Sequence, residues 1–446
     1  MSKTLEMMER DNKAVANALK LRFFPLSIAK AKGSMVYDED GNEYLDFNAG
    51  WGVANIGYGD ERVINAVNEQ MNQLTSNCLI SSSNARCGEL AEKLIDLVPG
   101  DFEKKVWFGH SGSDANEFIS KVVPMATGKP RILSFIGSYH GQTMGSYGMS
   151  GHPSQGQIIT LGNVVKVPYP YCYRCPFGKE AGSCDLFCAK YIEDYILKMA
   201  YDPKQIGAMI FESIMSDGGD VVPPDGFLKE MERIARKHGI WVVADEVKIG
   251  LGRTGKLFGF QNFDITPDAV VIGKPLAGGL PLSAVVGRKE LMDVGYGIHM
   301  FTTAGDPTSC AAALATLDIV QDDHLTENAR DIGAYLIDEF KKLQKKYDCI
   351  GDVRGKGLII GIEFVKNRAT KEPDSDTAAM VVYQSFTKGL MYYYAGTLEN
   401  VLELTPPLVL RKEEAEKAVR IIDESIDDVL NGRVSKDVLK EFTGWG

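Results

Sequence analysis

Short apolar runs and longer amphipathic stretches alternate along most of the chain. The runs at residues 240–244 and 269–272 are β-branched and bounded by polar or glycine positions. Such runs are typical of buried parallel strands in an open α/β sheet, although periodicity alone also permits a buried helix. Further strands are expected at residues 35–38, 43–47, 106–108, 132–136 and 207–211. Amphipathic helices are expected at residues 61–73, 84–98, 227–238, 325–347, 377–388 and 412–430.

The order of these elements predicts three parts of the chain. Residues 1–72 form an N-terminal segment, which begins with a helix and an extended arm and joins the smaller domain. Residues 73–325 form a large domain. Residues 326–446 form a small α+β domain, because strand-like runs at residues 350–365 lie between helices there.

Composition narrows the class of protein. The 446 residues carry a net charge of −11, with 44% hydrophobic and 24% charged residues. These values are ordinary for a soluble globular enzyme and argue against a nucleic-acid partner. No apolar run approaches the roughly 20 residues needed to cross a bilayer. The charged N-terminus lacks the apolar core of a signal peptide, so we expect a cytoplasmic protein with no membrane partner.

Half of the eight cysteines lie close together in sequence. Cys172, Cys175, Cys184 and Cys188 form a CxxC followed by a CxxxC, a spacing that fits a tetrahedral structural zinc site. The segment between the two pairs is short, however, and two disulfides or four free thiols fit the same spacing. We expect no catalytic metal, and all three states of the cluster stay open.

An acid and an amine follow the two central apolar runs: Asp245 after the first and Lys274 after the second. Ligands of open α/β sheets bind beyond the carboxyl ends of the strands, so these groups are expected to meet there. The pair suits pyridoxal phosphate, which needs a lysine to form a Schiff base with its aldehyde and a carboxylate against its pyridine nitrogen. Taken singly, Asp245 is better explained as a loop cap and Lys274 as a solvated surface lysine, because Asp and Lys are common at strand ends.

The stretch from WVVADEVKIG to VVIGKPLAGG, within residues 241–287, resembles the signature of the class-III aminotransferase family, and the resemblance covers nearly the whole chain. It implies pyridoxal 5'-phosphate as the cofactor and an α/β fold of type I, with a large domain built on a mainly parallel sheet and a smaller α+β domain. Lys274 is then the Schiff-base lysine and Asp245 the partner of the pyridine nitrogen. The family includes both aminotransferases and racemases, so it leaves the reaction open.

The sequence Ser111-Gly112-Ser113 lies between an expected strand and a helix expected from about Asp114. Backbone N–H groups at a helix N-terminus bind phosphate, and the hydroxyls add donors. Serine is also an ordinary helix cap, so the motif alone is weak evidence. The resemblance implies that these three residues hold the cofactor phosphate.

Further residues around the cofactor are assigned by the resemblance alone. Tyr139 is expected to stack on the pyridine ring, and His140 to support the ring environment, although both also fit a purely structural role. Trp51, in a glycine-rich loop, is expected to line the substrate pocket. Thr302, with Thr303 as the fallback, is expected to reach the phosphate of a neighbouring subunit, which implies a homodimer with shared active sites.

Three departures from the aminotransferase pattern bear on the reaction. Most of the family has glutamine after the DEV triplet, contacting the ring hydroxyl of the cofactor, where this chain has Lys248. Aminotransferases usually have glutamate before a double glycine, where this chain has Asp217. They often have arginine shortly before the PPL triplet, suited to a substrate carboxylate, where this chain has Glu403. Lys248 is therefore expected beside the cofactor and Glu403 beside the substrate. Each departure also has an ordinary structural explanation: Lys248 as a polar contact, Asp217 as a shortened glutamate and Glu403 as a solvent-facing residue. Together, DEVK and SDGG resemble the α-amino-ε-caprolactam racemase branch and the related isoleucine 2-epimerases.

These departures favour a racemase with two acid/base groups, Lys274 on one face of the substrate and Asp217 on the other. We expect desolvation to raise the pKa of Asp217 toward a useful range. The substrates expected are small amino compounds: amino acid amides, lactams or amino acids. An aminotransferase of ω-amino acids or amines is the alternative. A non-catalytic cofactor-binding homologue is a third hypothesis, against which the intact Lys274 and Asp245 argue.

Overall fold

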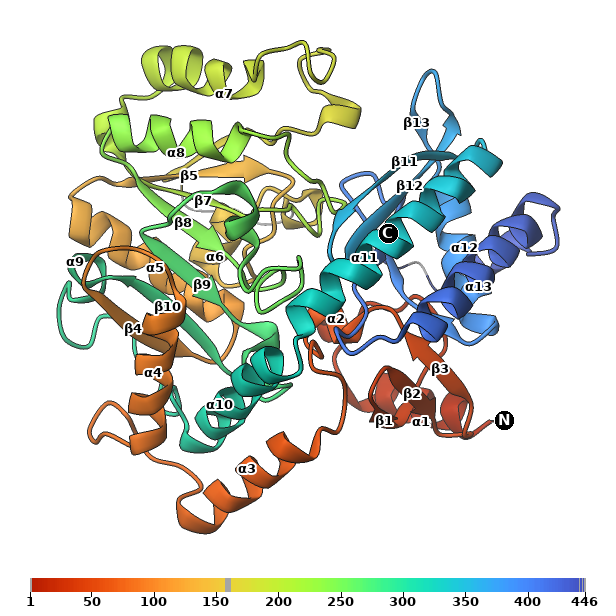
Figure 1. Cartoon of the computed structure of the whole chain (residues 1–446), viewed down its shortest axis with the longest axis horizontal. Coiled ribbons are helices and arrows are strands. Elements are labelled where there is room, and N and C mark those ends of the chain that lie inside the picture. The colour runs from red at the N-terminus through yellow and green to blue at the C-terminus, as the bar shows by residue number, and fades with distance from the viewer. Residues whose placement is uncertain (1, 157–161, 441, 443, 445–446) are drawn as a thin grey trace.

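A seven-stranded sheet forms the centre of the larger part of the molecule (Figure 1). In this computed structural model, residues 2–156, 162–440, 442 and 444 are described. The strands lie in the order β4 (Lys104–Gly109), β10 (Ser283–Arg288), β9 (Ala269–Ile272), β8 (Trp241–Asp245), β7 (Ile206–Phe211), β5 (Arg131–Ile136) and β6 (Val164–Pro168). Neighbours pair in parallel except at β10, which is antiparallel to both β4 and β9. The predicted α/β fold with a mainly parallel sheet is confirmed.

Helices cover both faces of this sheet, which explains why its central strands are apolar at almost every position. Val243 and Val271 pack in one apolar cluster with helix α5, whereas Val242 and Val270 pack in another on the opposite face. The helices of this part are α3 (Glu61–Gln73), α4 (Ala85–Leu97), α5 (Gly112–Thr127), α6 (Met144–Met149), α7 (Phe187–Tyr191), α8 (Phe227–Lys237), α9 (Lys289–Met292) and α10 (Pro307–Asp322).

Two further sheets bring the ends of the chain together, on the right of Figure 1. An antiparallel sheet contains β11 (Ile350–Lys356), β12 (Ile359–Asn367), β16 (Val401–Leu404) and β15 (Tyr393–Ala395), with β13 (Glu372–Pro373) paired to β12. The other contains β1 (Ile28–Lys32), β2 (Met35–Asp38), β3 (Glu43–Asp46) and β14 (Leu390–Met391), and β14 pairs in parallel with β3. The N-terminal strands thus share a sheet with the C-terminal region.

The predicted domain boundaries at residues 72 and 325 stay a prediction. Helix α3, which lies almost wholly within residues 1–72, packs against α10 of the larger part. The N-terminal helices α1 (Lys3–Ala14) and α2 (Ala49–Gly52) flank the strands β1 to β3. In the part of the chain that the structure describes, no helix is long and apolar enough to cross a membrane.

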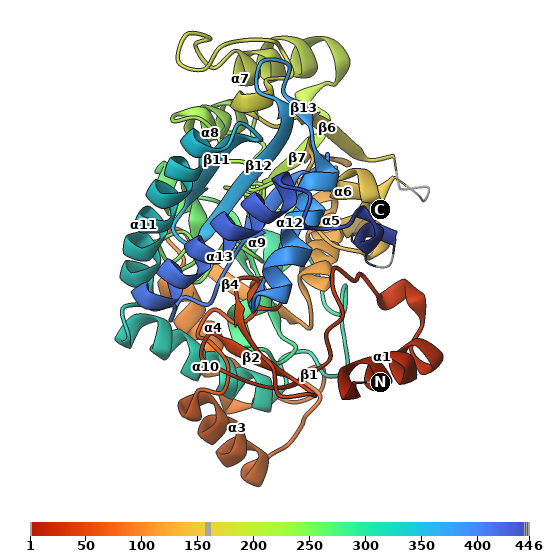
Figure 2. The same cartoon turned by 90° about the vertical axis from the view of Figure 1, so that its right-hand side faces the viewer.

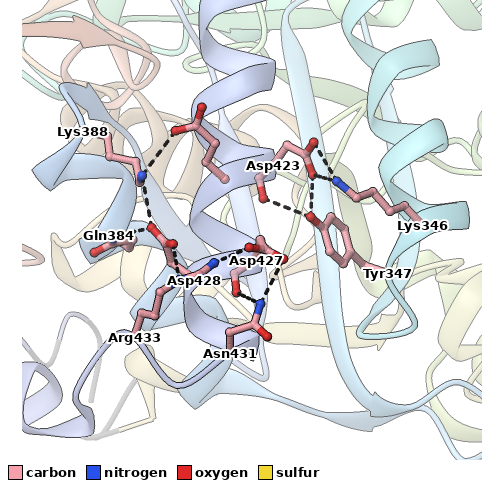
Figure 3. Close-up of polar contacts among 10 residues, drawn as sticks. Lys346, Tyr347, Gln384, Lys388, Asp423, Asp427, Asp428, Asn431 and Arg433 are labelled. Atoms are coloured by element: carbon pink, nitrogen blue, oxygen red, sulfur yellow. Dashed lines mark hydrogen bonds and ion pairs between the residues drawn. The ribbon is translucent and has the colours of Figure 1, made fainter.

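The C-terminal helices α11 (Leu325–Lys346), α12 (Ser375–Thr387) and α13 (Lys412–Leu430) cover the β11–β12 sheet (Figure 2). Polar contacts at their ends tie α13 to its neighbours (Figure 3): Asp423 binds Lys346 at 2.7 Å, and Asp428 binds Lys388 at 3.1 Å. Exposed ion pairs of this kind contribute about 0–1 kcal/mol each. The buried apolar faces of the three helices therefore supply most of the stability here.

Candidate active site

A cavity of about 340 Å³ opens at the carboxyl ends of the central strands. Loops that follow β4, β5, β7, β8 and β9 contribute to its wall, as expected for a ligand site in an α/β sheet. It brings together predicted residues from six separate places in the sequence: Ser111, Gly112, Ser113, Tyr139, His140, Asp217, Asp245, Lys248 and Lys274.

Asp245 is the last residue of β8, and its carboxylate is held by three donors. Its Oδ2 lies 2.7 Å from Nδ1 of His140 and accepts a hydrogen bond of 2.8 Å from the Asn116 amide. Its Oδ1 accepts from the backbone N–H of Val247 at 3.0 Å, so the loop-cap explanation also holds. Asn116 was not predicted as a site residue. The one indication of its role in the sequence was that Asn116 is a polar residue on the otherwise apolar, buried face of helix α5.

Lys274 lies one residue beyond the end of β9, after Gly273, and begins a short 3₁₀ helix, Lys274–Ala277. Its φ of 37° lies in the left-handed region, which is strained for a residue other than glycine. Burial lowers the pKa of its amine, and the positive charge of Lys248 lowers it further. A lower pKa raises the fraction of neutral amine, which is the form that condenses with an aldehyde. Lys274 is half-buried and lines the cavity, so the explanation as a solvated surface lysine does not describe it.

The N-terminus of α5 closes one end of the cavity. The helix begins at Gly112, with Ser111 as its cap, rather than at about Asp114. Ser111 Oγ accepts from the backbone N–H of Asp114 at 3.2 Å, so its capping role is real. A Cβ atom on Gly112 would lie 2.6 Å from a methyl group of Val247. Only glycine fits there, and its absent side chain leaves the N–H end of the helix open to an anion.

Lys248 is buried and binds two carboxylates. Its Nζ donates to Asp217 Oδ1 at 2.7 Å and to Glu403 at 2.7 and 2.8 Å, and lies 5.5 Å from the centre of the Trp51 ring. Glu403 has no exposed surface, so the solvent-facing explanation is wrong. Neither Glu403 nor Trp51 is among the described residues that line the cavity. Both contact Lys248 instead, and their predicted substrate contacts stay predictions.

The expected direction of the Asp217 pKa shift is wrong. Burial alone would raise the pKa of this carboxyl, but the positive charges of Lys248 and Lys274 outweigh it and lower the pKa to about 2. The same pairing raises the pKa of Lys248 although burial opposes this. Asp217 is consequently an ionised carboxylate at neutral pH. No local pattern indicates this pairing, because Lys248 is 31 residues away from Asp217 in the chain.

Glu212 connects the loop of Tyr139 to the loop of Asp217, and it was not predicted as a site residue. It lines the cavity and accepts hydrogen bonds from the backbone N–H groups of Tyr139 at 3.0 Å and Ser216 at 3.1 Å. Burial raises its pKa to about 7. The Tyr139 hydroxyl accepts from the Gln142 amide at 2.9 Å, so its ring is fixed at the cavity wall.

Thr302 and Thr303 are both exposed, and neither lines this cavity among the described residues. The hydroxyl of Thr303 lies 2.8 Å from Nε2 of His110, which does line it. The predicted contact of Thr302 with a neighbouring subunit's cofactor stays a prediction.

The four clustered cysteines surround a small pocket of about 20 Å³, away from the cavity. All eight cysteines are free thiols, and within the described residues no group of three or more His, Cys, Asp or Glu side chains is placed to hold a metal ion. Of the three alternatives for the cluster, the structure therefore shows free thiols and no disulfide. The zinc alternative stays a prediction, which elemental analysis can test.

A family model for class-III aminotransferases matches residues 16–426. The chain belongs to this family. It is 39% identical to a leucine/methionine racemase of Thermococcus litoralis, over 99% of both chains. It is 38% identical to an isoleucine 2-epimerase of Lentilactobacillus buchneri, over 100% of this chain and 99% of the relative. A solved (S)-enantioselective omega-transaminase from Thermomicrobium roseum superposes with a TM-score of 0.89 at 30% identity, over 96% of this chain and 100% of the transaminase.

As a class-III aminotransferase family member, this enzyme uses pyridoxal 5'-phosphate. The residues present fit that group. The open helix N-terminus at Gly112 suits a phosphate, Asp245 suits a protonated ring nitrogen, and the lowered pKa of Lys274 suits an amine that binds an aldehyde.

Proposed function

We propose that this enzyme is a racemase or epimerase of α-amino compounds: amino acid amides, lactams such as α-amino-ε-caprolactam, or amino acids. The observation that carries the proposal is that the wall of one cavity contains both Lys274 and a second ionisable side chain, Asp217. A racemase needs two acid/base groups because the proton leaves one face of the α-carbon and returns to the other.

In this mechanism Asp217 and Lys274 act on opposite faces. In one direction the carboxylate of Asp217 takes the α-proton, and the ammonium of Lys274 returns a proton to the other face. In the reverse direction the amine of Lys274 takes the proton and Asp217 returns one. The cofactor, when bound, supplies an electron sink for the pair left at the α-carbon. The contact with Lys248 fixes the orientation of Asp217.

The charges beside Asp217 bear on the substrate. Lys248 already binds the carboxylates of Asp217 and Glu403, so it is not a free cation for a substrate carboxylate. Two acidic side chains around one lysine disfavour a third anion nearby. This favours amides and lactams. The names of the racemase and epimerase relatives keep free amino acids within the proposal.

An aminotransferase of ω-amino acids or amines is the alternative. The likeness to an omega-transaminase structure supports it, and its proton transfer needs Lys274 alone. The departures at Lys248, Asp217 and Glu403 support the racemase instead. We also propose that the enzyme is a homodimer with shared active sites and that it is located in the cytoplasm.

The deciding experiment incubates the cofactor-loaded enzyme with single enantiomers of an amino acid amide, α-amino-ε-caprolactam and branched-chain amino acids, without any keto acid. Chiral chromatography then measures the opposite enantiomer. We expect it to accumulate to equilibrium, without a keto product. A stoichiometric keto or aldehyde product, with turnover only after a keto acid is added, would assign the aminotransferase.

A further inference from the structure

The loop that carries Asp217 is held from the C-terminal part of the chain. Met215 and Val221 bridge its base, so residues 216–220 form a tight turn. The backbone carbonyl of Asp217 accepts a hydrogen bond of 3.0 Å from the N–H of Gly396. The carbonyl of Gly219 accepts two from Arg354, from Nε at 2.9 Å and from Nη2 at 2.6 Å.

Arg354 lies on β11, and every N–H of its guanidinium has an acceptor. Besides the two bonds to Gly219, Nη1 donates to Asp352 at 2.9 Å and to Glu363 at 2.6 Å, and Nη2 donates to the Tyr171 hydroxyl at 2.7 Å. A guanidinium has five N–H donors in a fixed plane, and all five are used here. The Tyr171 hydroxyl also donates to Glu363, so the two residues that hold the guanidinium of Arg354 are themselves hydrogen-bonded to each other.

The guanidinium of Arg354 packs closely against the loop that carries Asp217. Gly219 has a φ of +112°, and a Cβ atom there would lie 3.2 Å from Nη2 of Arg354. The side chain of Arg354 is 9% exposed and that of Glu363 is fully buried. A buried, charge-assisted contact of this kind holds its acceptor more firmly than an exposed one. Arg354 is not among the described residues that line the cavity, so it acts on the site through the loop.

We propose that Arg354 is a positioning residue that holds Asp217 in place for proton transfer, and that Tyr171 and Glu363 keep Arg354 in that orientation. This inference rests on the proposed acid/base role of Asp217. It also gives a role to the segment just before the cysteine cluster, since Tyr171 directly precedes Cys172. Small displacements of a reacting group from its productive position cost as much as 10²-fold in rate.

The first test needs no activity. Amide hydrogen exchange of the peptide covering residues 213–222 is compared by mass spectrometry in the parent, Arg354→Met and Arg368→Met. Arg368 is the matched control, because it also donates to backbone carbonyls, those of Ile350 and Tyr347, but does not contact the loop. We expect faster exchange in this peptide for Arg354→Met only. Equal exchange in all three proteins would overturn the inference.

The second test measures racemisation by the same proteins. We expect kcat of Arg354→Met to fall about 10- to 100-fold with KM little changed, whereas removal of a general acid/base itself costs about 10²–10⁴-fold. Tyr171→Phe, which leaves the arginine in place, should show the same effect at smaller size and remains informative if Arg354→Met does not fold. Unchanged kcat in both variants, with Arg368→Met as reference, would contradict the positioning role.

The two tests separate the two proposals. If the parent racemises its substrate and the Arg354 variant matches it in kcat and in exchange, the positioning role is wrong and the proposed function stands. If the parent racemises none of the compounds, the proposed function is wrong, and the exchange of residues 213–222 alone decides whether Arg354 holds the loop.

Discussion

Replacing Lys248 with glutamine should shift the acid limb of the pH–rate profile to higher pH. In the parent, the positive charges of Lys248 and Lys274 overcome the effect of burial and hold the pKa of Asp217 at about 2. Without the charge of Lys248, burial still raises the pKa of Asp217, and only the charge of Lys274 still lowers it. We expect the pKa to rise to its ordinary 3.8 or above. Because the base form of Asp217 is needed, activity is then lost at a higher pH than in the parent.

The size of the effect follows from these values. A rise in pKa from about 2 to 3.8 makes the carboxylate about 60-fold more basic, which corresponds to roughly 2 kcal/mol. At pH 4, about 1% of Asp217 is protonated in the parent, against about 40% or more in the variant. The variant will also be less stable, since breaking a buried ion pair costs about 3–5 kcal/mol, although the glutamine amide can still donate to Glu403.

The assay is kcat/KM for one enantiomer from about pH 3 to pH 9, with cofactor content and thermal unfolding checked at each pH. Lys121→Gln serves as the control, because Lys121 is exposed, its Nζ lies 2.9 Å from Nδ1 of His299, and it is not among the described residues that line the cavity. A folded, cofactor-loaded Lys248→Gln enzyme with the parent's acid limb would refute the claim that Lys248 sets the pKa of Asp217.

The remaining predictions concern single groups. Lys274→Ala should abolish turnover and the visible absorbance of lysine-bound cofactor; a cofactor still covalently linked would contradict the assignment. Asp245→Asn should cripple the reaction, and undiminished activity would mean that another group protonates the ring nitrogen. Asp217→Ala should lower racemisation by about 10²–10⁴-fold while a transamination half-reaction survives far better, so near-parental racemisation would rule out its role. Elemental analysis should find zinc, with loss of stability on chelation, if the cysteine cluster is a metal site; a metal-free protein excludes it.

Local patterns were enough to predict the central strands and the groups at their ends. Asp245 follows one apolar run directly and Lys274 follows the other after a single glycine, so the rule for α/β sheets placed them at one edge. Strand β10 (Ser283–Arg288) was not predicted, because its apolar run is short and ends in an arginine. Its antiparallel pairing depends on contacts with distant strands.

The polar interior of the site was not predictable, because its contacts join residues far apart in sequence. Lys248 and Glu403 are separated by 155 positions, and no local pattern indicates that one binds the other. Without that contact, burial was the sole effect considered for Asp217, and the expected pKa shift had the wrong sign. Asn116 and Glu212 were missed for the same reason, since each takes its role from partners on other elements.

The contact of Lys248 with both Asp217 and Glu403 also constrains how one enzyme of this family can evolve into another. The arrangement typical of the aminotransferases, glutamine at position 248 and arginine at 403, cannot be reached through two neutral steps. Glu403→Arg alone would put two cations where Lys248 and Glu403 now meet at 2.7 Å, and Lys248→Gln alone would leave two buried carboxylates without a cation between them. Either intermediate loses a sizeable part of the roughly 5–15 kcal/mol that keeps a protein folded. The two positions are therefore an epistatic pair, and a library that aims to change the reaction must vary both at once.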